Sequence, residues 1–171
     1  MKPRERPTKT VVVFWKEVDV GLLQLKKALY MYRTVKGKKL LLIGKAGRET
    51  VRQRWACPSK ERVSRLATKV GISSVKPYIG CLFTSLPLTH SLVHDVEKVL
   101  IFNTQPSWNE TGKKSYTMAR ARLSVECTGD WPHPEWFFQH PPPRDIGIPM
   151  TTVIKIPCFV HTNSLPERTR R

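Results

Sequence analysis

The chain has no long apolar segment and no closely spaced cysteine pair, and these absences exclude several classes of protein. The apolar run at residues 11–15 is too short for the core of a signal peptide or for a membrane-spanning helix. Cys57, Cys81, Cys127 and Cys158 are far apart in sequence, so no C-x-x-C pair predicts a zinc site or a disulfide framework. We therefore expect an intracellular, cytoplasmic protein with reduced thiols and no membrane partner.

Acidic residues are also scarce. The chain of 171 residues carries 13 Asp and Glu against 30 Lys and Arg, which gives a formal net charge of +17. Such an excess favours a polyanionic partner, of which nucleic acid is the first candidate. A basic protein with a solvated positive face, or one associated with the ribosome, is the alternative interpretation. The length predicts one domain with extensions rather than two full domains.

Apolar periodicity and turn residues predict the elements of the first two thirds of the chain. We expect strands near residues 11–15, 28–34, 40–44 and 72–86, with a hairpin turn at Gly37 between the second and third. A helical segment at 49–70 is interrupted at Pro58, and a second helical segment runs from Thr89 or Ser91 to Asn103.

The last third of the chain has a different character. Residues 119–127 alternate between small or apolar and charged side chains, which predicts a half-exposed strand. Residues 131–144 hold five prolines and four aromatic residues, which predicts an ordered irregular loop. A last strand at 150–160 and a basic tail at 167–171 complete this extension.

One motif stands out within the predicted helix and the loop after it. Residues 97–109 have the pattern E-x-x-L-I-x-x-x-x-P-x-x-N, from Glu97 to Asn109. Upstream, Ala28-Leu29-Tyr30 lies in one predicted strand, and Leu42-Ile43-Gly44-Lys45 lies in the next. Arg52 follows ten positions after Leu42, in the predicted helix.

This order of tyrosine, glycine-lysine, helical arginine, glutamate and asparagine resembles the GIY-YIG endonuclease superfamily over about residues 26–110. The resemblance implies an α+β fold with a small three-stranded antiparallel sheet flanked by helices. Residues 1–25 would then be an N-terminal extension, and residues 111–171 a β-rich C-terminal extension with a proline-rich loop. The chain departs from the family pattern at Leu42, where the family has its second tyrosine.

The resemblance also implies roles for the matching residues. Glu97 would hold one Mg²⁺ or Mn²⁺ ion, and Arg52 would bind the scissile phosphate. Tyr30 would orient the attacking water, or act as its base if cations such as Lys45 lower its pKa. Gly44 and Asn109 would be structural, Asn109 by tying the loop after the helix to the sheet. Arg52 and Arg54 point to different faces of a helix, and the ten-residue spacing favours Arg52.

We therefore predict a divalent-metal-dependent endonuclease that hydrolyses DNA phosphodiester bonds. A catalytically inactive nucleic-acid-binding protein on the same fold, and a structural RNA-binding protein of a ribonucleoprotein assembly, remain as alternatives. RNA stays open beside DNA as the partner, and the oligomeric state is not predicted. Further cations are candidates for contacts to the nucleic-acid backbone: Arg48, Arg54, Lys113, Lys114, Arg120 and Arg122.

Overall fold

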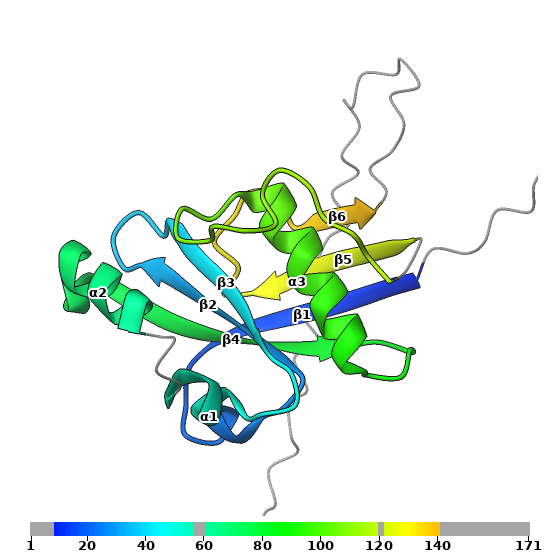
Figure 1. The fold of residues 1–171 in the computed structure, drawn as a ribbon, viewed down its shortest axis with the longest axis horizontal. Coiled ribbons are helices and arrows are strands. Elements are labelled where there is room, and N and C mark those ends of the chain that lie inside the picture. The colour runs from blue at the N-terminus through cyan, green and yellow to red at the C-terminus, as the bar shows by residue number, and fades with distance from the viewer. Residues whose placement is uncertain (1–8, 57–60, 120–121, 141–171) are drawn as a thin grey trace, which may run out of the picture.

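The computed structural model of the protein describes residues 9–56, 61–119 and 122–140. Its centre is one curled, mixed sheet of six strands in the order β3-β2-β4-β1-β5-β6 (Figure 1). The strands are β1 (Lys9–Glu17), β2 (Ala28–Thr34), β3 (Leu40–Ala46), β4 (Val75–Phe83), β5 (Leu123–Gly129) and β6 (Phe137–His140). All neighbouring strands are antiparallel except β1 and β5, which are parallel.

Three α-helices accompany the sheet in the described part of the chain. They are α1 (Val51–Ala56), α2 (Glu61–Val70) and α3 (His90–Thr104), together with short 3-10 turns η1 (Leu22–Gln24) and η3 (Ile72–Ser74). None of the described helices is long and apolar enough to cross a membrane.

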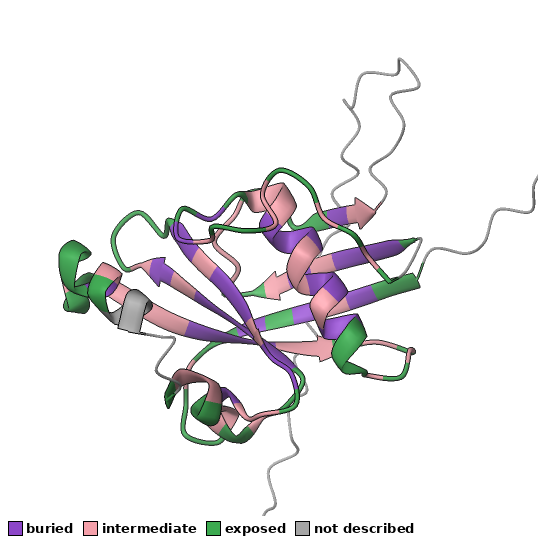
Figure 2. Ribbon diagram, viewed as in Figure 1, coloured by how far each residue is buried: buried purple, intermediate pink, exposed green. Residues whose placement is uncertain are grey.

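The helix α3 lies across one face of the sheet, as Figure 1 shows. Thr89 begins it as the N-cap, because its side-chain oxygen accepts a hydrogen bond from the backbone N–H of Leu92 at 3.1 Å. Gln105 ends it in the left-handed conformation, with φ 49°. Apolar residues of the helix face the sheet and form the main core with alternate residues of β1, β2, β5 and β6 (Figure 2).

The strand β1 shows why the sheet is wider than expected. Val11, Val13 and Trp15 are fully buried beneath α3, while the residues between them face the other side. Both edges of the strand are hydrogen-bonded, since Trp15 pairs with Gly80 of β4 and with Gly129 of β5. A β-carbon at Gly80 would lie 2.8 Å from a methyl group of Val13, so glycine leaves the room that β1 needs.

The predicted fold class is wrong in the extent and type of the sheet. We expected three antiparallel strands flanked by helices. The sheet has six strands, one pair of which is parallel, and it is accompanied by only three short α-helices in the described part of the chain. The additional strands β1, β5 and β6 come from the segments predicted as extensions, so the sheet crosses the boundaries drawn at residues 25 and 110. The reason is that β1 satisfies both of its edges with partners distant in sequence, which local patterns do not reveal.

The local predictions agree better with the structure. The strand at 28–34 has the predicted bounds, and the helix predicted to begin at Thr89 or Ser91 and end at Asn103 is α3. The helical segment at 49–70 consists of two helices, and its interruption at 57–60 lies outside the described residues. The loop predicted at 131–144 is wrong in part, because β6 lies within it and pairs with β5. The strand predicted at 150–160 and the tail at 167–171 lie outside the described residues.

Candidate active site

The residues that the motif singled out meet where α3 passes the edge strand β3. Lys45 of β3 donates a hydrogen bond from Nζ to Oε2 of Glu97 on α3 at 2.5 Å. Nδ1 of His94, one turn earlier on α3, lies 2.8 Å from the same Nζ and 3.3 Å from the same carboxylate oxygen. The side chain of Glu97 is 13% exposed, so this three-residue cluster is sheltered but reachable.

Tyr30 approaches this edge from the other face of the sheet. It pairs with Gly44 across β2 and β3, and a β-carbon at Gly44 would lie 2.4 Å from Cζ and 2.5 Å from the hydroxyl oxygen of Tyr30. The phenol ring therefore lies directly over Gly44, a position that only glycine allows. This contact gives Gly44 a steric role and places the ring beside the strand residue that precedes Lys45.

The Tyr30 hydroxyl is held in its protonated form. Burial raises the pKa of Tyr30 to about 12, although the nearby Arg54 guanidinium opposes the shift, and the carboxylates of Glu97 and Glu49 also raise it. Tyr30 is only 1% exposed. The cations do not lower the pKa below its usual value, so the condition we set for a base at neutral pH is not met. Tyr30 can act there as a hydrogen-bond donor.

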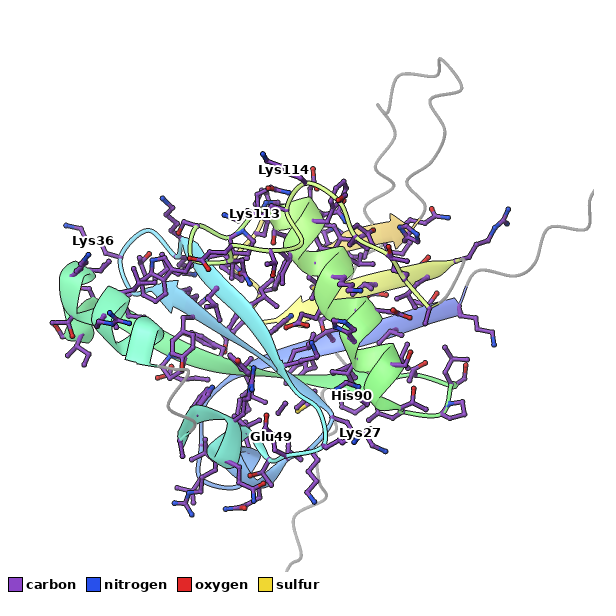
Figure 3. All side chains as sticks on the ribbon, in the orientation of Figure 1. Lys27, Lys36, Glu49, His90, Lys113 and Lys114 are labelled. Carbon is purple, nitrogen blue, oxygen red and sulfur yellow. The ribbon has the colours of Figure 1, made fainter. Side chains whose placement is uncertain are left out.

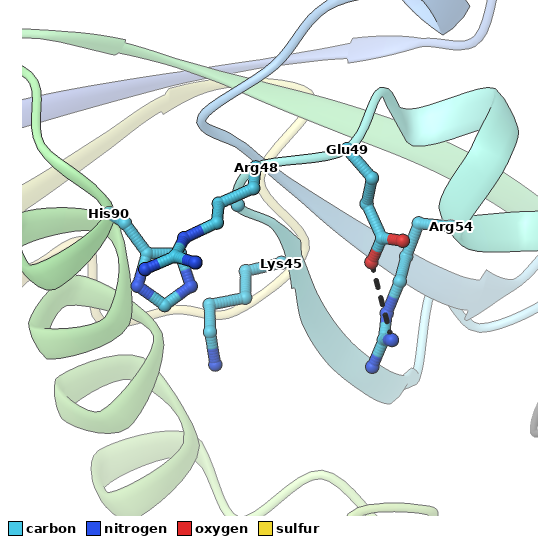
Figure 4. A pocket seen from close by; sticks show the side chains of 6 residues that line it. Lys45, Arg48, Glu49, Arg54 and His90 are labelled. Carbon is cyan, nitrogen blue, oxygen red and sulfur yellow. Dashed lines mark ion pairs between the residues drawn. The ribbon is translucent and has the colours of Figure 1, made fainter.

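A pocket of about 360 Å³ opens next to the cluster. It is lined by Lys45, Gly47, Arg48, Glu49, Arg54 and His90. Figure 4 shows Arg48 beside His90 and Lys45 pointing into the same space, with Glu49 and Arg54 opposite them. The residues come from the end of β3, the loop after it, α1 and the first turn of α3.

Glycine and an ion pair shape the two sides of this pocket. A β-carbon at Gly47 would lie 2.1 Å from Cδ2 of His90, so the imidazole packs directly on the loop backbone. On the other side, Nη1 of Arg54 lies 3.3 Å from Oε1 of Glu49, and both side chains are more than a third exposed. This surface ion pair contributes little to stability, but it fixes the guanidinium next to Tyr30.

The structure brings Arg54, and not Arg52, to the pocket. Both residues belong to α1, and Arg52 is exposed and absent from the described residues that line the pocket. Their two-residue separation along the helix explains the difference, since it turns them to different faces. The ten-residue spacing favours Arg52, whose role stays a prediction, while Arg54 was predicted as a backbone-contact residue.

Asn109 links the loop after α3 to the open edge of β3. Its Oδ1 accepts a hydrogen bond from the backbone N–H of Ile43 at 3.0 Å, and its Nδ2 donates one to the carbonyl of Ile43 at 2.8 Å. The N–H of Trp108 donates to the carbonyl of Leu41 at 2.7 Å. The asparagine amide therefore satisfies the edge as another strand would, and it fixes β3 relative to α3.

Three other predicted contact residues, Lys113, Lys114 and Arg122, do not line the pocket. Lys113 and Lys114 follow the C-terminal end of α3, where the carbonyl of Lys113 accepts a hydrogen bond from Gln105 at 2.7 Å, whereas the pocket is at the N-terminal end (Figure 3). Arg122 is exposed just before β5, and Arg120 lies outside the described residues.

Sequence reasoning missed three residues of the site. His90, His94 and Glu49 are not among the predicted site residues, and no sequence motif includes Glu49. The spacing of His94 and Glu97, three residues apart on one helix, is the sequence signal for their contact.

Three cations, Lys45, Arg48 and Arg54, and two carboxylates therefore surround the site. Among the described residues, no group of three or more His, Cys, Asp and Glu side chains could hold a metal ion. Both polar contacts of Glu97 go to Oε2, which leaves Oε1 without a partner among the described residues. Comparison with known proteins finds no matching family model, no matching curated protein and no matching solved structure.

Proposed function

We propose that the protein is a divalent-metal-dependent endonuclease that hydrolyses phosphodiester bonds of nucleic acid at the pocket beside Glu97. The observation that carries the proposal is the convergence of Glu97 with Lys45, His94 and the neighbouring arginines at one edge of the sheet. Such a site offers a carboxylate and fixed positive charge, with the protonated phenol of Tyr30 next to Arg54, and phosphodiester hydrolysis needs groups of these kinds.

The cations would bind the phosphate. Arg54 and Arg48 present guanidinium groups, whose planar forks match the geometry of phosphate oxygens. The pocket is open to solvent and of a size to admit a phosphodiester, and the charge of the whole chain favours a polyanion at this position. Arg54 takes here the role that the resemblance assigned to Arg52.

Tyr30 would orient groups at the reacting phosphate as a donor. Its raised pKa keeps the phenol protonated, and its ring is fixed by Gly44 on one side and by an edge-to-face contact with Trp55, at 5.9 Å between ring centroids, on the other. A fixed, neutral hydroxyl donates a hydrogen bond without needing to reorganise.

The residues present fit the single Mg²⁺ or Mn²⁺ ion that the resemblance implies. Glu97 would hold it through Oε1, since Lys45 and His94 both contact Oε2. One carboxylate suffices for a cation that keeps several waters and takes further oxygens from the phosphate. The ion would supply charge neutralisation and water activation when bound.

A specific observation favours a second candidate function, nucleic-acid binding without cleavage. The ammonium group of Lys45 already neutralises Glu97, and Leu42 replaces the tyrosine of the family pattern. In that case the same cationic pocket would bind a backbone phosphate and no metal would be needed.

The test is a plasmid-cleavage assay with matched variants. Purified protein is incubated with supercoiled plasmid at low salt with Mg²⁺, Mn²⁺ or chelator, alongside Glu97→Gln and Arg54→Ala. We expect metal-dependent nicking that both variants reduce at least about a hundredfold. Glu17→Gln is the control for the glutamate, because Glu17 also pairs with a lysine, Lys76 at 2.9 Å, but lies away from the pocket.

Arg52→Ala is the control for the arginine, because it removes the same charge from the same helix outside the pocket. Activity should stay within about threefold of the wild type in both controls. If the wild type shifts the plasmid without cutting it under all metal conditions, the second candidate function replaces the first. Equal losses in Arg52→Ala and Arg54→Ala would instead refute the assignment of Arg54.

A further inference from the structure

The half of the sheet around β1 has a second face with exposed aromatic rings. Since alternate residues of β1 pack beneath α3, the residues between them point to the opposite face. Phe14 of β1, Phe83 of β4 and Phe137 of β6 belong to that face by their register, and they are 43%, 59% and 47% exposed. Rings of this size are usually buried in a folded protein.

The register places these rings in an ordered array. Phe83 pairs with Val12, Val12 with Glu126 and Glu126 with Phe137, so four strands contribute one row across the sheet. Phe14 lies two residues further along β1, diagonally from Phe83, and such neighbours are about 7–8 Å apart. A single carboxylate, Glu126, therefore lies between the outer rings. We call this set, Phe14, Phe83, Glu126 and Phe137, the aromatic face.

The neighbouring part of the same sheet surface is covered. There, η1 and α1 pack on β2, β3 and β4 through a small core formed by Ala28, Ala46, Val51 and Ile79 with partly buried leucines and Trp55. That core ends at Cys81 of β4, which pairs with Phe14. The aromatic face begins where this cover stops.

We propose that the aromatic face binds unpaired bases of single-stranded nucleic acid by stacking. Each base has an apolar π-face that stacks on an exposed ring, and bases of a single strand are free to do so whereas those of a duplex are already stacked. Lys16 lies on the same face two residues after Phe14, but its ammonium group pairs with Asp19 at 3.1 Å. The positive charge that favours a nucleic acid here is that of the whole chain, which carries +17.

The carboxylate distinguishes this partner from an apolar protein surface. Charged residues are depleted from the centre of protein–protein interfaces, yet Glu126 lies in the middle of the row of rings. A carboxylate accepts hydrogen bonds from amino groups such as N4 of cytosine. We therefore expect cytosine-rich single strands to bind more tightly than thymine-rich ones.

Binding at the aromatic face does not depend on cleavage at the pocket, so the two proposals can fail separately. The experiment measures fluorescence anisotropy of labelled 12-nucleotide cytosine and thymine single strands, and of a duplex, with full-length protein in chelator. Phe83→Ala and Phe137→Ala should each weaken single-strand binding at least about fivefold and leave duplex binding within twofold.

Conservative variants separate stacking from apolar contact and from misfolding. Phe83→Leu keeps an apolar side chain without a ring and should lose as much affinity as Phe83→Ala, while Phe83→Trp should retain wild-type affinity. Ile72→Ala, at an exposed apolar residue outside the aromatic face, should change nothing. Glu126→Gln should remove the preference for cytosine over thymine.

Three outcomes would overturn the proposal. They are unchanged single-strand affinity in Phe83→Ala and Phe137→Ala, equal losses for single strand and duplex, and wild-type binding by Phe83→Leu. Light scattering accompanies each sample, because a wild-type dimer that the phenylalanine variants dissociate would assign the face to a second copy of the chain.

Discussion

The two halves of the sheet are built by the same alternation of side chains but present different surfaces. Around β2, β3 and β4, one face is covered by α3 and the other by η1 and α1, and Lys45 and Glu97 meet at the open edge of β3. Around β1, β5 and β6, α3 covers one face and the other carries exposed rings. Where both faces of the sheet are covered, a charged pocket forms at its edge. Where only one face is covered, the other is a broad surface with apolar rings.

The difference teaches how one sheet can support two kinds of contact. The pocket depends on side chains fixed from several directions: Tyr30 by Gly44 and Trp55, and β3 by Asn109. The aromatic face depends only on strand register, because its rings come from three strands of one sheet. Substitutions should therefore disturb the two regions by different mechanisms and to different extents.

The largest effect should come from β1, whose alternate residues face α3 on one side of the sheet and the aromatic face on the other. Trp15 is fully buried, and its ring stacks on that of Trp131 at 5.5 Å between centroids. Trp15→Ala should lower the free energy of unfolding by about 3–5 kcal/mol, because it leaves a large cavity beneath α3. Phe14→Ala, one residue earlier on the exposed face, should cost only about 1 kcal/mol. Urea denaturation of both variants checks the contrast, and equal costs would contradict the assignment of the faces.

An intermediate effect should follow from filling the space over the edge strand. Gly44→Ala places a methyl group 2.4 Å from the Tyr30 ring, and it should lower the free energy of unfolding by about 2 kcal/mol and displace the phenol from its position over β3. Tyr30→Leu removes the atoms that clash. The double variant should therefore be clearly less destabilised than the sum of the single variants, as a double-mutant cycle in urea would measure. Additive losses would show that the ring does not depend on the glycine.

The smallest effect concerns alkaline pH. The pKa of Tyr30 is about 12 in the folded protein and 10.0 in the unfolded chain. As the pH rises, the unfolded chain therefore releases this proton first. The contribution of Tyr30 is complete below pH 10 and disappears between pH 10 and 12, and it amounts to about 1 kcal/mol at pH 11. Tyr30→Phe should flatten the fall in stability over this interval. Burial also raises the pKa of Tyr32, so a residual slope should remain.

Local features were predictable because they depend on neighbours in sequence. The strand near residues 11–15, the turn at Gly37, the cap at Thr89 and the link through Asn109 all follow from nearby residues or from one motif. The helical phase that separates Arg52 from Arg54 was also apparent. The packing of α1 on the sheet decides which of these two arginines points toward the pocket, and spacing along the chain does not contain that information.

Strand order could not be predicted for a related reason. The apolar run at residues 11–15 indicates a strand, but it does not say which strands lie beside it. The parallel pairing of β1 with β5 joins Val13 to Cys127 across most of the chain. No motif predicted that Glu49 lines the pocket, because its position follows from the path of the loop between β3 and α1.

The central position of β1 has a consequence for how the protein folds. Trp15 pairs with Gly80 of β4 and with Gly129 of β5, which are both distant in the chain. The six-stranded sheet is therefore complete only after these long-range contacts have formed. The hairpin of β2 and β3 needs no such search. Chains dominated by distant pairings fold slowly, and their unpaired strand edges are exposed to other chains in the meantime. The pocket side should thus assemble early, while the rate of folding is set by the arrival of β5 beside β1.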